Sequence, residues 1–120
     1  ELEKCGERRC FENEEFTAFT PYASRFNFEI WVFPKKHKTR LEKVNLALLA
    51  EVFKKVLEKL AKLNTSYNIS VHYSPKNEDL HLHFEIQPRI STWGGFEFTS
   101  GAVINSVAPE DAAKFYRGEA

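Results

Sequence analysis

The chain has 120 residues, 42% of them hydrophobic and 28% charged, which is typical of one globular domain with a core of its own. Its 17 basic residues balance 17 acidic ones, so the net charge of zero argues against a nucleic-acid or membrane binder. No apolar run is long enough to span a bilayer. Cys5 and Cys10 fit neither a zinc knuckle nor a disulfide framework, and we expect free thiols in a cytoplasmic domain covering residues 1–120.

Alternating apolar and polar residues predict a series of short strands. In chain order they are expected at 8–12, 16–20, 28–33, 67–73 and 79–87, with one more at 102–105. Pro34 and Pro88 are expected to end the strands that precede them, because proline lacks the N–H that a ladder needs. The residues at 74–78 predict a turn that makes an antiparallel hairpin of the strands on either side.

Two helices are expected. Hydrophobic residues from Val44 to Leu63 recur at three- and four-residue steps, and lysines occupy the other side, which indicates an amphipathic helix laid on a sheet. A second helix begins near Pro109 and runs to about Arg117. This order predicts an α+β fold: an antiparallel β-sheet with one long helix packed on a face and a short C-terminal helix.

The stretch 79–89 separates into two faces. Its apolar face holds Leu80, Leu82, Phe84 and Ile86, and its polar face holds His81, His83, Glu85 and Gln87. The stretch 67–73 separates in the same way, with Tyr67, Ile69, Val71 and Tyr73 as its apolar set. If the two apolar faces share a core, His72 lies on the same sheet face as His81 and His83.

Three imidazoles on one sheet face suit a metal site. Histidines two apart on a strand lie roughly 6–7 Å from each other, so both rings reach one ion. Zinc or iron suits imidazole best, with Glu85, Asp79 or a carboxylate from another segment as the fourth ligand. Two alternatives stay open at this point: a polar face that holds no metal, and His83 as a nucleophile toward phosphorus.

Residues 81–89, with the sequence HLHFEIQPR, resemble the H-x-H-x-H-x-x-P-R strand of the histidine-triad superfamily, with Glu85 at the third histidine position. Further motifs follow one branch of that superfamily in order. They are ENEEF at 12–16, PYASRF at 21–26, FEIW at 28–31, PKKH at 34–37, YN at 67–68 and GFE at 95–97. Together they resemble the C-terminal half of the galactose-1-phosphate uridylyltransferase family, from about Gly6 to Arg117.

The resemblance implies a part in UMP transfer between UDP-glucose and a hexose 1-phosphate, in galactose metabolism. The family's nucleophile lies in a His-Pro-His-Gly-Gln motif of the N-terminal half, and this sequence has no such motif. The resemblance therefore implies that the chain is inactive by itself. It also implies a structural zinc or iron ion bound by His72, His81 and His83, with a glutamate from the other half as the fourth ligand.

The same resemblance places Gly95, Phe96 and Glu97 at the hexose 1-phosphate, in the active site of the partner subunit of a homodimer. Asn105 is a weaker candidate for a sugar contact. Phe96 stands where bacterial members have tyrosine, and a phosphate-binding lysine is missing nearby, so the preferred hexose stays open. Two other functions are considered: a stand-alone nucleotide hydrolase using His83, and a non-catalytic domain that binds sugar phosphate or nucleotide.

Overall fold

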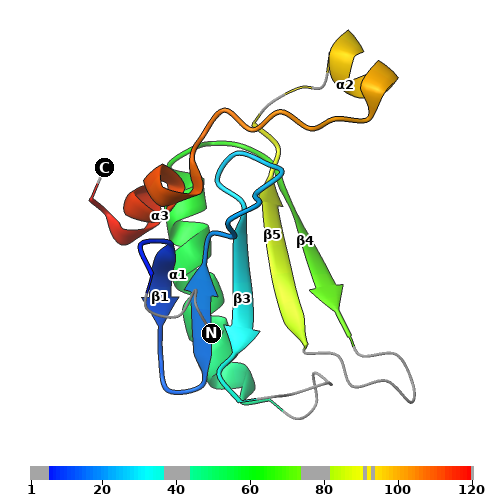
Figure 1. The fold of residues 1–120 in the computed structure, drawn as a ribbon. Helices are drawn as coiled ribbons and strands as arrows, with labels where there is room; N and C mark the ends of the chain where they lie inside the picture. The colour runs from blue at the N-terminus through cyan, green and yellow to red at the C-terminus, as the bar shows by residue number, and fades with distance from the viewer. Residues whose placement is uncertain (1–5, 37–43, 74–81, 91, 93, 120) are drawn as a thin grey trace.

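The computed structural model describes residues 6–36, 44–73, 82–90, 92 and 94–119. The strands are β1 (Arg9–Glu12), β2 (Phe16–Phe19), β3 (Ile30–Pro34), β4 (Tyr67–His72) and β5 (His83–Pro88). The helices are α1 (Leu46–Ala61), α2 (Gly95–Ser100) and α3 (Pro109–Arg117). All strand pairs are antiparallel, in the order β1-β2-β3-β5-β4, and α1 and α3 lie behind the sheet in Figure 1. The predicted α+β class is confirmed.

Helix α1 forms where the periodicity predicts it. Asn45 caps its first turn, because the Asn45 side-chain oxygen accepts hydrogen bonds from the backbone N–H groups of Ala47 at 3.0 Å and Leu48 at 3.3 Å. The buried face comes from four residues at steps of three and four, which are Leu49, Val52, Val56 and Leu60. The helix thus lays one apolar stripe on the sheet.

The core lies between α1, α3 and four of the five strands. Its strand members are Cys10, Phe16, Ala18, Ile30, Val32, Phe84 and Ile86, joined by Leu82 just before β5. Phe53 of α1 meets Phe84 of β5 edge to face, with ring centroids 5.2 Å apart. From α3, the fully buried Tyr116 donates a hydrogen bond to the Phe28 carbonyl oxygen at 2.6 Å, which fixes the chain just before β3.

The apolar residues of 67–73 lie outside this core, although His72 does share a sheet face with His83. Tyr67, Ile69, Val71 and Tyr73 keep 40%, 43%, 42% and 50% of their surface exposed. Their side chains point to the same side of the sheet as those of Phe84 and Ile86, since Val71 pairs with Phe84 and Ile69 with Ile86. β4 is an edge strand beyond the helix layer, so this side of it is left uncovered.

Pro34 and Pro88 end β3 and β5, as predicted. Each proline is the last residue of its strand and still pairs, Pro34 with Phe16 and Pro88 with Tyr67. The Pro34 nitrogen points toward β5 and the Pro88 nitrogen toward β3. The ladder between β3 and β5 does not extend to either position, so neither proline removes a ladder hydrogen bond. The strand predicted from residue 28 begins at Ile30, because Phe28 adopts a left-handed φ of 62°.

The strand predicted at 102–105 is absent, and these residues form an irregular return from α2 to α3. A six-residue helix, α2, lies just before them. Pro109–Arg117 forms the predicted C-terminal helix, with proline in its first turn and two acidic residues at its positive end. Every helix among the described residues is too short or too polar to cross a bilayer.

Removing the Leu60 side chain tests the α1–sheet core. Leu60 is 1% exposed, so Leu60→Ala leaves a cavity and should lower the free energy of unfolding by about 2–5 kcal/mol. Leu46→Ala is the matched control on the same helix, because Leu46 is 62% exposed and its loss should cost less than about 0.5 kcal/mol. Urea denaturation measures both values, and equal losses would contradict this packing.

Candidate metal centre and sugar-phosphate arm

Three metal-ligating side chains converge where β4 and β5 pair. His72 and His83 lie directly opposite each other in the ladder, and Glu85 follows two residues later on the same face. The two imidazole rings are stacked, with centroids 4.4 Å apart and planes 8° from parallel. We call these three residues the His–Glu cluster. His81, the third predicted ligand, and Asp79 lie outside the described residues.

The ligand atoms of the His–Glu cluster are close together. Glu85 Oε2 lies 3.1 Å from His72 Nε2 and 2.8 Å from His83 Nε2, and one ligand atom from each residue falls within 4.8 Å of the others. Glu85 is buried, while the His72 side chain is 47% exposed. The second carboxylate oxygen of Glu85 accepts a hydrogen bond from Gln87 Nε2 at 3.3 Å, which orients the carboxylate.

This donor set fits a zinc-type ion. Two imidazole nitrogens and one carboxylate oxygen are among the ligands that zinc prefers, and iron accepts the same groups. Ligand atoms about 2.0–2.1 Å from a tetrahedral ion lie about 3.3 Å from one another, so the two separations between Glu85 and the histidines need to widen by only a few tenths of an ångström. The cluster could therefore hold a metal ion once the facing ring nitrogens carry no proton.

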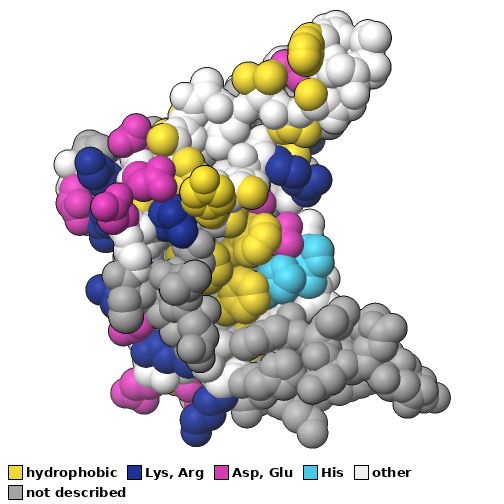
Figure 2. All heavy atoms as spheres, viewed as in Figure 1, with side chains coloured by type: hydrophobic (Ala, Val, Ile, Leu, Met, Phe, Trp, Pro, Cys, Tyr) yellow, Lys and Arg dark blue, Asp and Glu magenta, His cyan; other side chains and the backbone are white. Residues whose placement is uncertain are grey.

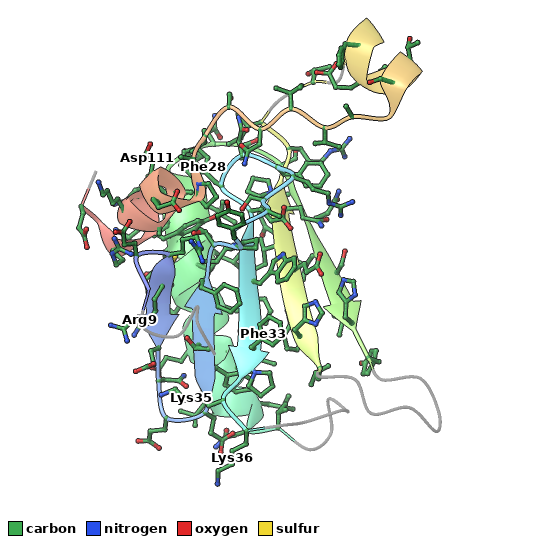
Figure 3. All side chains as sticks on the ribbon, viewed as in Figure 1. Arg9, Phe28, Phe33, Lys35, Lys36 and Asp111 are labelled. Atoms are coloured by element: carbon green, nitrogen blue, oxygen red, sulfur yellow. The ribbon has the colours of Figure 1, made fainter. Side chains whose placement is uncertain are left out.

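A row of stacked rings holds His83 in place. Phe19 of β2 stacks on Phe33 of β3 at 5.4 Å, and Phe33 stacks on His83 at 4.6 Å with planes 7° apart. Figure 3 labels Phe33, and Figure 2 shows hydrophobic side chains in contact with the histidines on this face. With His72 on its other side, the His83 ring is fixed between two flat surfaces. Such packing restricts the rotamers of the His83 side chain and so preorganises it as a metal ligand.

The predicted sugar-phosphate residues lie on an arm. Gly95, Phe96 and Glu97 begin α2, and none of its six residues is buried. Figure 1 shows α2 projecting beyond the end of β5, away from the rest of the domain. Glu97 Oε2 accepts a hydrogen bond from the Gly94 backbone N–H at 3.0 Å, closing the first turn of the helix. Phe96 is 59% exposed, so the arm presents an aromatic ring outward, while Glu97 is partly buried.

Asn105 fixes the returning limb of this arm. Its side-chain nitrogen donates to the Ser24 carbonyl oxygen at 3.1 Å, and its side-chain oxygen accepts from the Val107 backbone N–H at 3.0 Å. A second link, not foreseen from the sequence, joins Asn27 to Ser106 through two hydrogen bonds of 3.1 and 3.2 Å. Asn27 and Ser106 lie about 80 residues apart in the chain, as do Ser24 and Asn105. No local sequence pattern therefore predicts either link.

The cluster and the arm lie at opposite ends of β5. His83 is the first residue of the strand and Pro88 the last, so about 17 Å of strand separates the cluster from the start of the arm. An ion at the cluster is therefore too far from Glu97 to act on the same bound group. This geometry favours a structural role for the His–Glu cluster.

No protein-family model matches the chain. ADP-glucose phosphorylase from Arabidopsis thaliana is 38% identical over 117 residues, covering 88% of this chain and 33% of that protein. Galactose-1-phosphate uridylyltransferase from Thermotoga maritima is 31% identical over 134 residues, covering 97% of this chain and 42% of that protein. The chain therefore spans between a third and half of the length of these curated relatives.

Solved structures agree. The Arabidopsis ADP-glucose phosphorylase with bound ADP-glucose superposes with a TM-score of 0.81 at 34% identity, over 92% of this chain and 39% of that one. The chain is a homologue of galactose-1-phosphate uridylyltransferase and of ADP-glucose phosphorylase, which match about nine-tenths of its length. A zinc-bound histidine-triad protein from Mycobacterium smegmatis, at 18% identity and a TM-score of 0.64, covers 92% of this chain and 81% of that one and shares the fold.

Metal addition tests the His–Glu cluster. Zinc that binds the folded chain should raise its melting temperature, and His83→Ala should weaken zinc binding at least about tenfold because a ligand is lost. Isothermal titration calorimetry and thermal melts measure both effects at pH 7.5. His37→Ala is the control for loss of a histidine outside the cluster. Equal zinc binding by the His83→Ala and native chains would refute the site.

Cys10 lies in the core, away from the cluster, and provides a pH test. Burial raises the pKa of its thiol to about 12, an effect that the nearby Arg117 only partly offsets. In a Cys5→Ser background, iodoacetamide at pH 8 should label Cys10 only after urea denaturation, as read by intact mass. Because the folded pKa exceeds the ordinary value of 9.0, this thiol should also reduce stability as pH rises from about 9 to about 12. Rapid labelling of the native chain would contradict this burial.

Proposed function

We propose that residues 1–120 form the C-terminal domain of a hexose-1-phosphate uridylyltransferase. Homology to these relatives supports a nucleotide-sugar transferase domain, and the feature that carries the finer assignment is the projecting α2 arm, with Phe96 exposed and Glu97 partly buried on it. In this proposal the domain supplies contacts to a hexose 1-phosphate and a structural metal site. The transferred group is UMP, passed between UDP-glucose and galactose 1-phosphate.

The chemical step needs residues that the chain does not contain. The sequence has no His-Pro-His-Gly-Gln motif, so we assign the uridylylated histidine to polypeptide outside residues 1–120. His83 is a poor substitute in this geometry, because its ring is stacked between Phe33 and His72 and its Nε2 faces the Glu85 carboxylate. The domain therefore binds and positions, and it is not expected to transfer UMP by itself.

The arm is suited to a sugar phosphate. A carboxylate accepts hydrogen bonds from sugar hydroxyl groups, and an exposed aromatic ring offers an apolar surface to the sugar ring. Glu97 uses one oxygen to cap α2, which leaves its second oxygen for a sugar hydroxyl. Because the arm points away from its own domain, we assign its target to the active site of the partner subunit in a homodimer.

The metal completes the proposal. His72 and His83, with His81, would hold zinc or iron, and Glu85 lies where it can supply a carboxylate from this chain. A bound ion would supply crosslinking between β4 and β5 rather than chemistry on the substrate, because the cluster and the arm occupy opposite ends of β5. A cytoplasmic location is part of the same proposal.

Glu97→Gln tests the arm in the complete enzyme, with residues 1–120 joined to the family's N-terminal half. Glutamine can still cap α2, but it loses the charged acceptor, so kcat/KM for the hexose 1-phosphate should fall about 10- to 100-fold. Uridylyl exchange is measured with UDP-glucose and, in parallel, ADP-glucose, since one relative is named for the latter. Glu58→Gln on the exposed side of α1 is the matched control.

Two results would overturn this proposal. Undiminished exchange in the Glu97→Gln enzyme would remove the role given to the arm. Release of a nucleoside monophosphate by residues 1–120 alone, abolished by His83→Asn, would show instead a stand-alone histidine-triad hydrolase.

A further inference from the structure

The α2 arm is attached to the rest of the domain through its two limbs (Figure 1). On the outgoing limb, the Arg89 N–H donates to the Ser66 carbonyl oxygen at 2.7 Å. On the returning limb, Asn105 and Ser106 bond to the connection between β2 and β3, residues 24–29, which we call the base loop. None of the six residues of α2 is buried, so the direction of the arm depends on these attachments.

The returning limb is held by a buried amide. Asn27 is 7% exposed, and its side-chain nitrogen donates to the Ser106 hydroxyl oxygen at 3.1 Å while its side-chain oxygen accepts from the Ser106 backbone N–H at 3.2 Å. Beside it, the Asn105 side chain donates to the Ser24 carbonyl oxygen at 3.1 Å. Two consecutive residues of the limb are thus bonded to the base loop, and Asn27 uses both ends of its amide on one of them. Such a pair of bonds restricts the direction of the limb as well as its position.

The base loop is itself fixed by a buried carboxylate. Glu29 is 2% exposed, and its Oε1 accepts from the backbone N–H groups of Arg25 at 2.9 Å and Phe26 at 3.3 Å. Its Oε2 accepts from the Trp31 indole N–H at 2.7 Å, which ties the loop to β3. A polar group is buried at low cost only when hydrogen bonds satisfy it. Glu29 belongs neither to the His–Glu cluster nor to the predicted sugar contacts, so holding the base loop is the role that its bonds support.

Phe28 adds backbone strain to the base loop. Its φ of 62° lies in the left-handed region, which a bulky residue rarely adopts. Helix α3 holds it there, because Tyr116 donates to the Phe28 carbonyl oxygen at 2.6 Å and the Phe115 ring meets the Phe28 ring edge to face at 5.0 Å. Strained backbone persists where its surroundings over-determine it, and it is concentrated at functional sites. A strained residue directly after Asn27 therefore favours a function for the base loop.

We propose that Asn27 is a positioning residue for the sugar-phosphate arm, and that Glu29 acts through the base loop to hold Asn27. Through Ser106, Asn27 sets the direction in which α2 projects, and so the place that Phe96 and Glu97 reach. The target, a hexose 1-phosphate, rests on the function proposed above, whereas the hold on the arm rests on the hydrogen bonds of the base loop. A misplacement of about 1 Å can cost about 100-fold in rate even when it originates far from the reacting atoms, so this hold matters for transfer.

Loss of a positioning residue has its own kinetic signature. Asn27→Ala removes no contact to the sugar phosphate, but it lets the arm adopt directions in which Phe96 and Glu97 miss their target. The apparent affinity then falls with the fraction of molecules whose arm is placed correctly. In the complete enzyme, KM for the hexose 1-phosphate should rise at least about fivefold, while kcat at saturating substrate changes less than about twofold. Uridylyl exchange measures both parameters.

The direction of the arm can also be measured without substrate. Nitroxide labels at Thr99→Cys on α2 and Lys54→Cys on α1 report the distance between arm and domain by pulsed electron paramagnetic resonance, in the Cys5→Ser background of the 120-residue chain. The native chain should give a narrow distance distribution, and Asn27→Ala should broaden it. Ser106→Ala loses the hydroxyl group but keeps its backbone N–H on Asn27, so its distribution should lie between the two. It carries the same test if Asn27→Ala does not fold.

Asn45→Ala is the matched control. The Asn45 side chain also makes two hydrogen bonds, to the N–H groups of Ala47 and Leu48, but it makes them at the start of α1. Its loss should lower stability as the loss of a helix cap does, without removing a bond to the base loop or the arm. The distance distribution and KM should therefore stay native. Circular dichroism verifies that each variant is folded.

The positioning role fails on either of two results. One is a distance distribution that Asn27→Ala leaves as narrow as in the native chain, or that Asn45→Ala broadens equally. The other is an unchanged KM in Asn27→Ala under conditions where Glu97→Gln lowers exchange, since the arm would then act without this hold. Undiminished exchange in Glu97→Gln removes instead the role given to the arm, and the distance measurement alone then decides whether Asn27 sets its direction.

Discussion

The sheet is wider than the helix layer that covers it, and most features of this domain depend on that mismatch. α1 and α3 bury side chains from β1, β2, β3 and β5, and no residue of β4 belongs to the core. Tyr116 and the α1 stripe hold the covered strands together through apolar burial, which dominates folding free energy. β4 is attached by its ladder to β5 and by the His–Glu cluster on the opposite face.

The period-two pattern predicted side-chain direction and failed to predict burial. Leu82, Phe84 and Ile86 alternate as expected and are at most 3% exposed. Ile69 and Val71 alternate in the same way, yet more than 40% of each is exposed. Alternation of apolar and polar residues shows that the two faces of a strand differ in chemistry. Whether the apolar face is buried depends on where a helix distant in sequence crosses the sheet. The strand order, with β5 between β3 and β4, is equally non-local.

The helix periodicity, by contrast, predicted α1 almost to its ends, because sixteen residues carry a long enough repeat. α2 is too short for periodicity, and its available signal was Glu97 three residues after Gly94, the spacing of a capping box. The family resemblance makes Asn105 a weaker candidate for a sugar contact, and in the structure its amide bonds Ser24 and Val107. Polar side chains that fix loops and those that bind ligands look the same in a sequence.

The apolar face of β4 is not covered, so the core does not fix the register in which β4 pairs with β5. A slip of β4 by one residue would turn every side chain of the strand to the other face, and the core would not oppose it because β4 contributes nothing to the core. The slip would, however, carry His72 away from His83 and Glu85. An ion bound by all three would add a strong penalty to any register but the observed one, since a ligand that binds only the native arrangement stabilises it by mass action. With an ion bound, the His–Glu cluster would do for β4 what α1 does for the other strands.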